Sequence, residues 1–286
     1  MSYILETRDL TQVYGAGTPF ERTALDHVNI QVEKGEILGV IGHTGSGKST
    51  LIQHFNGLLK PTSGEVLLSG HSIWDAKGKC DRKTRFAVGL VFQYPEYQLF
   101  EETIAKDIAF GPQNMGLSAT EVEKRVREAM DFVGLDPALA NHSPFALSGG
   151  QKRRVAIAGV IAMRPQVLIL DEPTAGLDPA GRDEILAQIQ DYHARSGATI
   201  LIVSHSMEDI ARMADRLLVM NRAHVMLCGT PREVFARADE IVEAGLDIPE
   251  ITKVIRELNR RGIDLDPSIY TVEDAVRAIR AYKEGK

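Results

Sequence analysis

The sequence of 286 residues predicts an α/β fold built on a central, largely parallel β-sheet. Three apolar runs, at residues 37–42, 167–170 and 198–204, have the length of buried strands. Helical segments lie between them, and strands that alternate with helices favour parallel pairing. Hydrophobic residues make up 44% of the chain, so we expect a sizeable globular core.

The N-terminal third carries the signals of several strands and one helix. Residues 1–35 alternate polar and apolar side chains, as half-buried strands do, and the run ILGVIG ends at a glycine. A helix is expected over residues 48–58. Residues 66–92 indicate further strands, interrupted by the charged stretch DAKGKCDRKTR, which is typical of a solvated loop.

The middle of the chain turns helical at Ser118. Ser118 and Glu121 fit a capping box, in which each side chain satisfies a backbone donor at the helix start. Apolar residues at spacings of three or four then predict one buried face, formed by Val122, Val126, Met130 and Val133.

The last third predicts a hairpin followed by helices. Residues 216–229 have the pattern of two strands that turn near residues 221–222. Residues 231–286 show helical periodicity and little strand signal. We therefore expect a domain over residues 1–230 and a small helical C-terminal appendage over 231–286.

Charge, cysteine content and hydropathy narrow the class of protein. The chain has 33 Lys and Arg against 39 Asp and Glu, a net charge of −6, so no nucleic-acid partner is expected. Cys80 and Cys228 share no close spacing, which indicates neither a zinc site nor a disulfide framework and favours a reducing cytosol. The N-terminus lacks a signal peptide's apolar region, and the longest apolar run, 155–163, is too short to span a bilayer. Work at a membrane would therefore require docking to it.

A glycine-rich motif, GHTGSGKS, lies between the first buried strand and the first helix. This setting is that of a phosphate-binding loop, in which backbone N–H groups at a helix N-terminus cradle an anion. Lys48 would reach the β- and γ-phosphates of a nucleotide, and Ser49 would ligate Mg²⁺. The alternative is a chance glycine-rich turn, which the strand before and the helix after disfavour. The candidate ATP-binding residues here are Gly42, His43, Thr44, Gly45, Ser46, Gly47, Lys48, Ser49 and Thr50.

Two adjacent carboxylates end the second buried strand. Asp171 would hold Mg²⁺ through water, and Glu172 would polarise a nucleophilic water. The alternative is a pair that caps the following helix. His205 follows the third buried strand; a lone histidine there is more often structural, but in an ATP site it can bind the γ-phosphate and sense its loss.

A second helix N-terminus suited to binding phosphate occurs at Leu147-Ser-Gly-Gly-Gln151, where a hydroxyl and two glycines begin a helical segment. By itself this motif could be only an N-cap with a tight turn. Two such sites far apart in one sequence suggest a nucleotide held between two subunits.

Taken together and in this order, GHTGSGKST, Gln93, LSGGQ, LILDEP, TAGLD and SH resemble the ATP-binding cassette (ABC) ATPase family over residues 3–230. The resemblance implies a P-loop NTPase core of ABC type with an antiparallel β subdomain and a helical subdomain at about 94–165. It implies the cofactors ATP and Mg²⁺, and hydrolysis by in-line attack of water on the γ-phosphorus. Lys48, Gln93, Glu172 and His205 would be catalytic, and Ser49, Gln93 and Asp171 would surround the metal.

The resemblance also assigns residues to a second ATPase and to adenine. Asp178 would contact the opposite subunit. The signature residues Ser148, Gly149, Gly150 and Gln151 would cap the γ-phosphate of ATP on the partner's P-loop, in a homodimer or a paralogous heterodimer. Tyr14 is the candidate for stacking on adenine, with Phe20 as the alternative because GAGTPFERT is longer than in many relatives.

Within the family, QYPEYQLFEETIAKDIAFGPQNMG, GHTGSGKST and the GTPREVF segment resemble the ATPases of energy-coupling factor (ECF) transporters, in particular the second, A-prime-type subunit. These proteins act at the cytoplasmic face of the membrane. With membrane T- and S-components they import vitamins or metal ions. The resemblance implies an ATPase–ATPase contact through the appendage.

The segment FQYPEYQLF is unusually apolar for a loop, and Pro95 and Glu96 disfavour a buried strand. By resemblance it would form part of a groove for a coupling helix of the T-component, lined by Tyr94, Tyr97, Leu99 and Phe100. The alternative is that these side chains pack beneath the neighbouring helices.

Three other functions share some of these sequence features. A soluble ABC ATPase acting on DNA or ribosomes would usually have two cassettes or a coiled-coil insertion, and this chain has one contiguous cassette. An ATPase of another ABC importer or exporter class is the second alternative. A scaffold with a degenerate site is the third, and the presence of Lys48, Asp171, Glu172 and His205 disfavours it.

Overall fold

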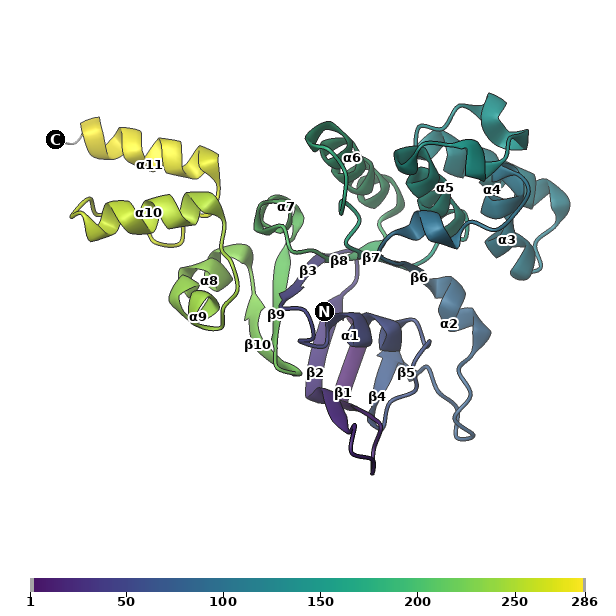
Figure 1. Cartoon of the computed structure of the whole chain (residues 1–286), viewed down its shortest axis with the longest axis horizontal. Helices are drawn as coiled ribbons and strands as arrows, with labels where there is room; N and C mark the ends of the chain where they lie inside the picture. The colour runs from purple at the N-terminus through teal and green to yellow at the C-terminus, as the bar shows by residue number, and fades with distance from the viewer. Residues whose placement is uncertain (1–2, 285–286) are drawn as a thin grey trace.

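The computed structural model describes residues 3–284 and contains two β-sheets that face each other across α1 (Figure 1). The smaller sheet is antiparallel with the order β2-β1-β4-β5. Its strands alternate buried and exposed side chains along much of their length, as the sequence pattern predicted. Their bounds are Tyr3–Tyr14 (β1), Arg22–Glu33 (β2), Ser63–Leu68 (β4) and His71–Ser72 (β5).

The larger sheet has the order β10-β9-β3-β8-β7-β6 and is parallel except for its edge strand β10. The strands β3, β7 and β8 are buried along their whole length, which explains their uninterrupted apolar sequences. The bounds are Ile37–Gly42 (β3), Val88–Val91 (β6), Val167–Asp171 (β7), Thr199–Val203 (β8), Arg216–Asn221 (β9) and His224–Gly229 (β10). The carboxyl ends of β3, β7 and β8 therefore meet at one edge of the sheet.

Helices extend the core in two opposite directions (Figure 1). A helical subdomain follows β6 and contains η1 (Pro95–Gln98), α3 (Ile104–Asn114), α4 (Ala119–Phe132), η2 (Pro137–Asn141), η3 (Pro144–Ala146) and α5 (Gly149–Ile161). The core itself adds α1 (Lys48–Phe55), α2 (Arg82–Ala87), α6 (Pro179–Ser196) and α7 (Met207–Met213). The chain ends in α8 (Pro231–Ala236), α9 (Ala238–Glu243), α10 (Glu250–Arg260) and α11 (Val272–Glu284), and α10 and α11 lie far from α3 and α4.

The appendage consists of two parts. Helices α8 and α9 pack into the main core through Phe235 and Ile241, both fully buried. Helices α10 and α11 have a small core of their own, formed by Ile255, Leu265, Ile269 and Ala275. Ion pairs Arg232–Asp266 and Arg256–Asp239, and the ring contact of Phe235 with Tyr270, join the two parts.

Several local predictions are confirmed and two need correction. Ser118 caps α4 by accepting a hydrogen bond from the backbone N–H of Glu121, which is one half of the expected capping box; the Glu121 carboxylate pairs with Arg125 instead. The hairpin turns at residues 222–223. The last four residues of the charged stretch, 82–85, begin α2 and are not part of a loop, because the Asp81 side chain caps the first turn of this helix. The helix expected over 48–58 ends at Phe55. Within residues 3–284 no helix is long and apolar enough to cross a membrane.

Candidate active site

The phosphate-binding loop runs from the end of β3 to the start of α1 and is enclosed by neighbouring backbone. A Cβ on Gly42 would lie 2.4 Å from the carbonyl oxygen of Met220, and one on Gly47 would lie 2.4 Å from that of Ala24. Both glycines also have positive φ angles, 155° and 107°. No other residue fits these two positions, so the glycine spacing in the motif follows from close packing of the loop.

Lys48 begins α1 and is 6% exposed. Its Nζ donates hydrogen bonds to the carbonyl oxygens of Gly42 and His43, the latter at 2.9 Å. Burial lowers the pKa of Lys48, while the charges of Glu172 and Asp171 act in the opposite direction. The ammonium is thus fixed inside the loop, on the side that faces the two acids.

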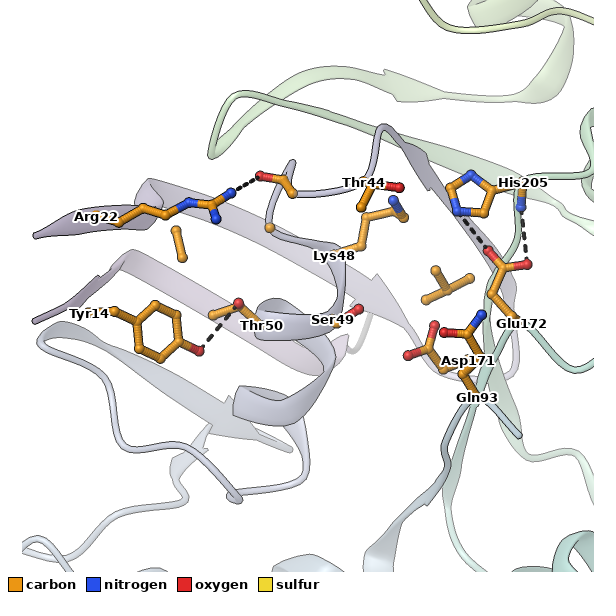
Figure 2. A pocket seen from close by; sticks show the side chains of 14 residues that line it. Tyr14, Arg22, Thr44, Lys48, Ser49, Thr50, Gln93, Asp171, Glu172 and His205 are labelled. Atoms are coloured by element: carbon orange, nitrogen blue, oxygen red, sulfur yellow. Dashed lines mark hydrogen bonds and ion pairs between the residues drawn. The ribbon is translucent and has the colours of Figure 1, made fainter. Parts of the chain in front are cut away.

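A cavity of about 320 Å³ lies in front of the loop (Figure 2). Most of the residues that the sequence singled out for ATP and Mg²⁺ line it, namely Tyr14, Thr44, Gly45, Gly47, Lys48, Ser49, Thr50, Gln93, Asp171, Glu172 and His205. Gly42, His43 and Ser46 belong to the loop but are not among the lining residues. Segments separated by more than 150 positions therefore converge on one pocket.

Asp171 ends β7 in a buried position that disfavours the ionised form of its carboxyl group. Burial, and next the neighbouring Glu172, raise the pKa of Asp171 to about 6, although Lys48 and His205 oppose the shift. A cation bound next to Asp171 would stabilise the ionised carboxylate and offset the cost of burying its charge.

Glu172 is held in a left-handed conformation, φ 50°, by a backbone hydrogen bond from its N–H to the carbonyl of Val203 (2.9 Å). Its Oε2 accepts from the backbone N–H of His205 at 3.4 Å, and its Oε1 lies 3.4 Å from His205 Nε2. Oε1 is buried and has no hydrogen-bond partner among the described residues. Burial raises the pKa of Glu172, which makes it a better proton acceptor.

His205 stands at the rim, with its side chain 58% exposed. Burial, and next the charge of Lys48, lower its pKa, which favours the neutral imidazole at physiological pH. A neutral ring can donate one hydrogen bond to a phosphate oxygen while Glu172 holds its backbone. The arrangement is compatible with the sensing role implied by the resemblance.

The donor set in the cavity fits magnesium bound together with a nucleotide. Ser49, Gln93 and Asp171 offer hydroxyl, amide and carboxylate oxygens, the ligand types that Mg²⁺ prefers. Within residues 3–284 no group of three His, Cys, Asp or Glu side chains could hold a metal. The protein would supply these few oxygen ligands to a bound ion, and phosphates and water would supply the rest.

The two adenine candidates are placed differently. Tyr14, at the end of β1, lines the cavity, and its hydroxyl lies 3.4 Å from Thr50 Oγ1. Phe20 is 87% exposed and is not among the lining residues. Arg22, which the sequence did not single out, lines the cavity and donates to the carbonyl of Gly45 (3.4 Å) (Figure 2).

The signature and Asp178 lie outside this cavity. Ser148 and Gln151 form a capping box at the start of α5, and a Cβ on Gly149 or Gly150 would meet open space. Asp178 caps α6 by accepting a hydrogen bond from the N–H of Gly181 (2.8 Å). The local roles of both motifs are therefore caps, and both helix starts reach solvent.

The four groove candidates are placed in three different environments. Leu99 is 8% exposed and packs in the main core, and Phe100 is 57% exposed and stacks edge-on against Phe110. Leu99 and Phe100 line a second cavity of about 330 Å³ between α2, β6, α3 and α5. Tyr94 and Tyr97 are exposed and are not among its lining residues.

The profile of the ABC transporter family matches residues 25–175, more than half of the chain. The chain belongs to this family of ATPases. The energy-coupling factor transporter ATP-binding protein EcfA2 of Caldanaerobacter subterraneus subsp. tengcongensis is 54% identical over 281 residues, 98% of each chain. EcfA2 of Symbiobacterium thermophilum is 55% identical over 277 residues, which cover 97% of this chain and 96% of the relative.

Solved structures agree with this assignment. The cbiO1 protein of Clostridium perfringens, described as part of the ABC transporter complex cbiONQ, superposes with a TM-score of 0.74 at 40% identity. The match covers 91% of this chain and 96% of that one. A dimeric ATP-binding cassette bound to ADP and Pi gives a TM-score of 0.69 at 28% identity over 79% of this chain and 98% of that one. The ABC ATPase fold and the similarity to the second-type ECF ATPases are thereby confirmed, and the chain is an ATP-hydrolysing enzyme of a transporter family.

Glu172→Gln tests the base assignment. We expect the variant to bind ATP within about threefold of the wild type and to lose about 100-fold or more of its turnover, because an amide cannot accept the proton of the attacking water. Nucleotide binding and phosphate release by the assembled complex are the measurements. Glu123→Gln, on the exposed side of α4, is the control. Unchanged hydrolysis in Glu172→Gln would remove Glu172 from the base role.

Asp171→Asn tests the charge penalty in the nucleotide-free protein without Mg²⁺. The pKa of Asp171 in the folded state is raised to about 6, so the folded state binds this proton more tightly than the unfolded state does. Ionisation of Asp171 therefore lowers the free energy of unfolding of the protein as the pH rises from about 4 to 6. At pH 7.5 the free energy of unfolding of the variant should exceed that of the wild type by roughly 1–3 kcal/mol, which would raise Tm by about 2–8 °C. The gain should vanish below about pH 4.

The control for this prediction is Asp183→Asn, whose side chain is 68% exposed. Thermal melts of both variants at pH 7.5 and at pH 4 separate the buried charge from a general effect of removing an acid. Equal melting temperatures of Asp171→Asn and wild type at pH 7.5 would contradict the charge penalty.

Proposed function

We propose that this chain is the ATPase of an ECF-type importer, which couples ATP binding and hydrolysis to uptake of a vitamin or a transition-metal ion. Membrane T- and S-components would carry the substrate, and this chain would work at the cytoplasmic face of the membrane as a peripheral subunit. The observation that carries the proposal is the similarity to EcfA2 proteins over nearly the whole length of both chains. That similarity includes the appendage, which the ABC family profile does not cover.

The reaction follows from the geometry of the site. Glu172 orients a water molecule against the γ-phosphorus and accepts its proton, since burial raises the pKa of the carboxylate and its Oε1 accepts no hydrogen bond from the described residues. Lys48 and the N–H groups of the loop neutralise phosphate charge, and His205 holds the γ-phosphate at the rim. Ser49, Gln93 and Asp171 would hold Mg²⁺, which would supply further neutralisation of phosphate charge.

Completion of the site requires a second ATPase. The start of α5, with Ser148, Gly149, Gly150 and Gln151, is a helix N-terminus with open space before it, suited to the γ-phosphate on another subunit. Asp178 at the start of α6 would lie at the same contact. The partner is a second copy or a paralogue, and ATP between the two chains favours the closed dimer.

The cavity beside Phe100 is the proposed seat of the T-component's coupling helix. Exposed rings at Phe100 and Phe110 rim an apolar hollow whose floor includes Leu99, a combination that suits a helix inserted by its apolar face. We therefore propose that Phe100 contacts the coupling helix and that Leu99 forms the floor of the hollow that receives it. Tyr94 and Tyr97 lie on the approach from Gln93 and would contact the partner only outside the hollow.

Phe100→Arg tests the groove. Because Phe100 is largely exposed, the variant should fold and bind ATP, whereas a charge in the hollow should reduce recovery of membrane partners about tenfold or more. Phe20→Arg, an exposed aromatic in the β1–β2 loop, is the matched control. Leu99→Arg is unsuitable because it would place a charge in the core. Equal recovery of partners with Phe100→Arg would exclude this surface.

Affinity purification of the tagged chain from its native membranes tests the wider proposal. We expect a second ABC ATPase and at least two integral membrane proteins, one shared T-component and one substrate-binding S-component. Uptake assays with that S-component then identify a vitamin or a metal ion. Recovery of no integral membrane protein would refute the transport role.

A further inference from the structure

The P-loop is in contact with the C-terminal appendage through one side chain. His43 follows Gly42 in the loop, and its Nε2 lies 2.7 Å from the carbonyl oxygen of Ala244, just after α9. A carbonyl only accepts hydrogen bonds, so Nε2 carries the proton and donates it. The contact joins residues 201 positions apart. His43 points to the appendage and is not among the residues lining the ATP cavity.

The backbone of the same residue is joined to the phosphate-binding machinery. The carbonyl oxygen of His43 accepts a hydrogen bond from Lys48 Nζ at 2.9 Å and one from the N–H of Ser46 at 3.0 Å. A shift of His43 therefore alters the position of the Lys48 ammonium and the curvature of the loop. One residue connects the appendage to the groups that hold phosphate.

The acceptor side of the contact is rigidly placed. Gly245 closes α9 with a positive φ of 77°, and the backbone of Gly245 and Leu246 donates to Val242 (2.8 Å) and Ile241 (3.0 Å). Ile241 and Leu246 are buried in the main core. A Cβ on Gly245 would lie 3.1 Å from His43 Nε2, so a side chain at this position would require the imidazole to move by a few tenths of an ångström.

The appendage also touches the other side of the site. The backbone N–H of Glu250, at the start of α10, donates to Glu208 Oε1 at 3.2 Å. Glu208 lies in the first turn of α7, three residues after His205. Hydrogen bonds from the appendage thus reach the segments that follow β3 and β8, which bracket the ATP cavity.

We propose that His43 is a positioning residue that couples the P-loop to the C-terminal appendage, so that ATP binding and the placement of the appendage influence each other. Because such coupling is reciprocal, the packed turn after α9 favours the phosphate-binding form of the loop, and bound ATP stabilises that turn. The inference rests on ATP binding by this chain and is independent of the transported substrate.

Two substitutions at His43 test the donor. His43→Ala removes the hydrogen bond and should weaken ATP binding by the full-length chain roughly 2–10-fold, the range expected for one hydrogen bond. His43→Gln keeps an N–H at a similar distance from the backbone and should recover most of the affinity. Both are measured by calorimetric titration with ATP and Mg²⁺, using chain that carries Glu172→Gln to prevent turnover. Unchanged affinity in His43→Ala would overturn the proposal.

Two glycines of the appendage provide a matched pair on the acceptor side. Gly245 and Gly262 both have positive φ, 77° and 86°, so Ala strains the backbone at either position. Only at Gly245 does the added Cβ meet His43, whereas at Gly262 nothing lies within 4 Å. Gly245→Ala should weaken ATP binding and Gly262→Ala should not. In a His43→Ala background Gly245→Ala should add little, because the contact is already lost. Additive effects, or equal effects of the two glycine variants, would refute the coupling.

The reciprocal direction is tested by hydrogen exchange. ATP should slow exchange of the amides around residues 242–248 in the otherwise wild-type chain carrying Glu172→Gln, because the ligand stabilises the loop to which they are tied. The same protection should be absent when His43→Ala is added. Two results would contradict the role of His43. In one, ATP still slows exchange of this segment when His43→Ala is added; in the other, ATP slows it in neither protein.

Discussion

The structure depends on the close enclosure of the P-loop backbone. The loop packs against the carbonyl oxygens of Ala24 in β2 and Met220 in β9 so closely that a Cβ on Gly47 or Gly42 would clash with them. The hairpin tip adds hydrogen bonds on the same side, since the N–H of Ala223 donates to Ser46 (3.1 Å) and its carbonyl accepts from Asp26 (2.9 Å). The antiparallel sheet, the hairpin and the loop are therefore one unit. A preformed anion cradle results, and the nucleotide need not order it.

The site carries unfavourable electrostatics that its function explains. Asp171 and Glu172 are buried side by side with raised pKa values, and Lys48 is buried with a lowered one, each because desolvation disfavours the charged form. The opposite charges offset this penalty only in part. A magnesium ion and a triphosphate together would supply the opposite charges, so the burial of these three side chains would favour binding of a nucleotide that carries its metal.

The sequence predicted what depends on local chemistry and missed what depends on distant contacts. The loop from Gly42 to Ser49 was recognisable because a strand, a turn and a helix leave a fixed pattern. Arg22 was not, since a single charge on an edge strand has no pattern until β1 pairs with β2. The burial of Leu99 was undetermined because an apolar segment does not reveal which of its side chains face inward. Helix α2 was missed because a helix of six residues, four of them polar, is too short to show an apolar period, although Asp81 was a capping signal.

A buried arginine shows how the separate parts of the chain act together. Arg153 of α5 is 2% exposed, and its guanidinium donates to the carbonyls of Pro173 (3.1 Å) and Ala175 (2.8 Å), just after the acid pair. It also meets Glu96 at 3.4 Å, in the apolar segment that follows Gln93. Arg153 thus joins the signature helix to the segment that follows the acid pair and to the segment that leads from Gln93 to the proposed groove. Displacing any of the three would leave a buried guanidinium without its partners, an expensive state. The three segments are therefore constrained to move together, as an ATPase that works on a partner requires.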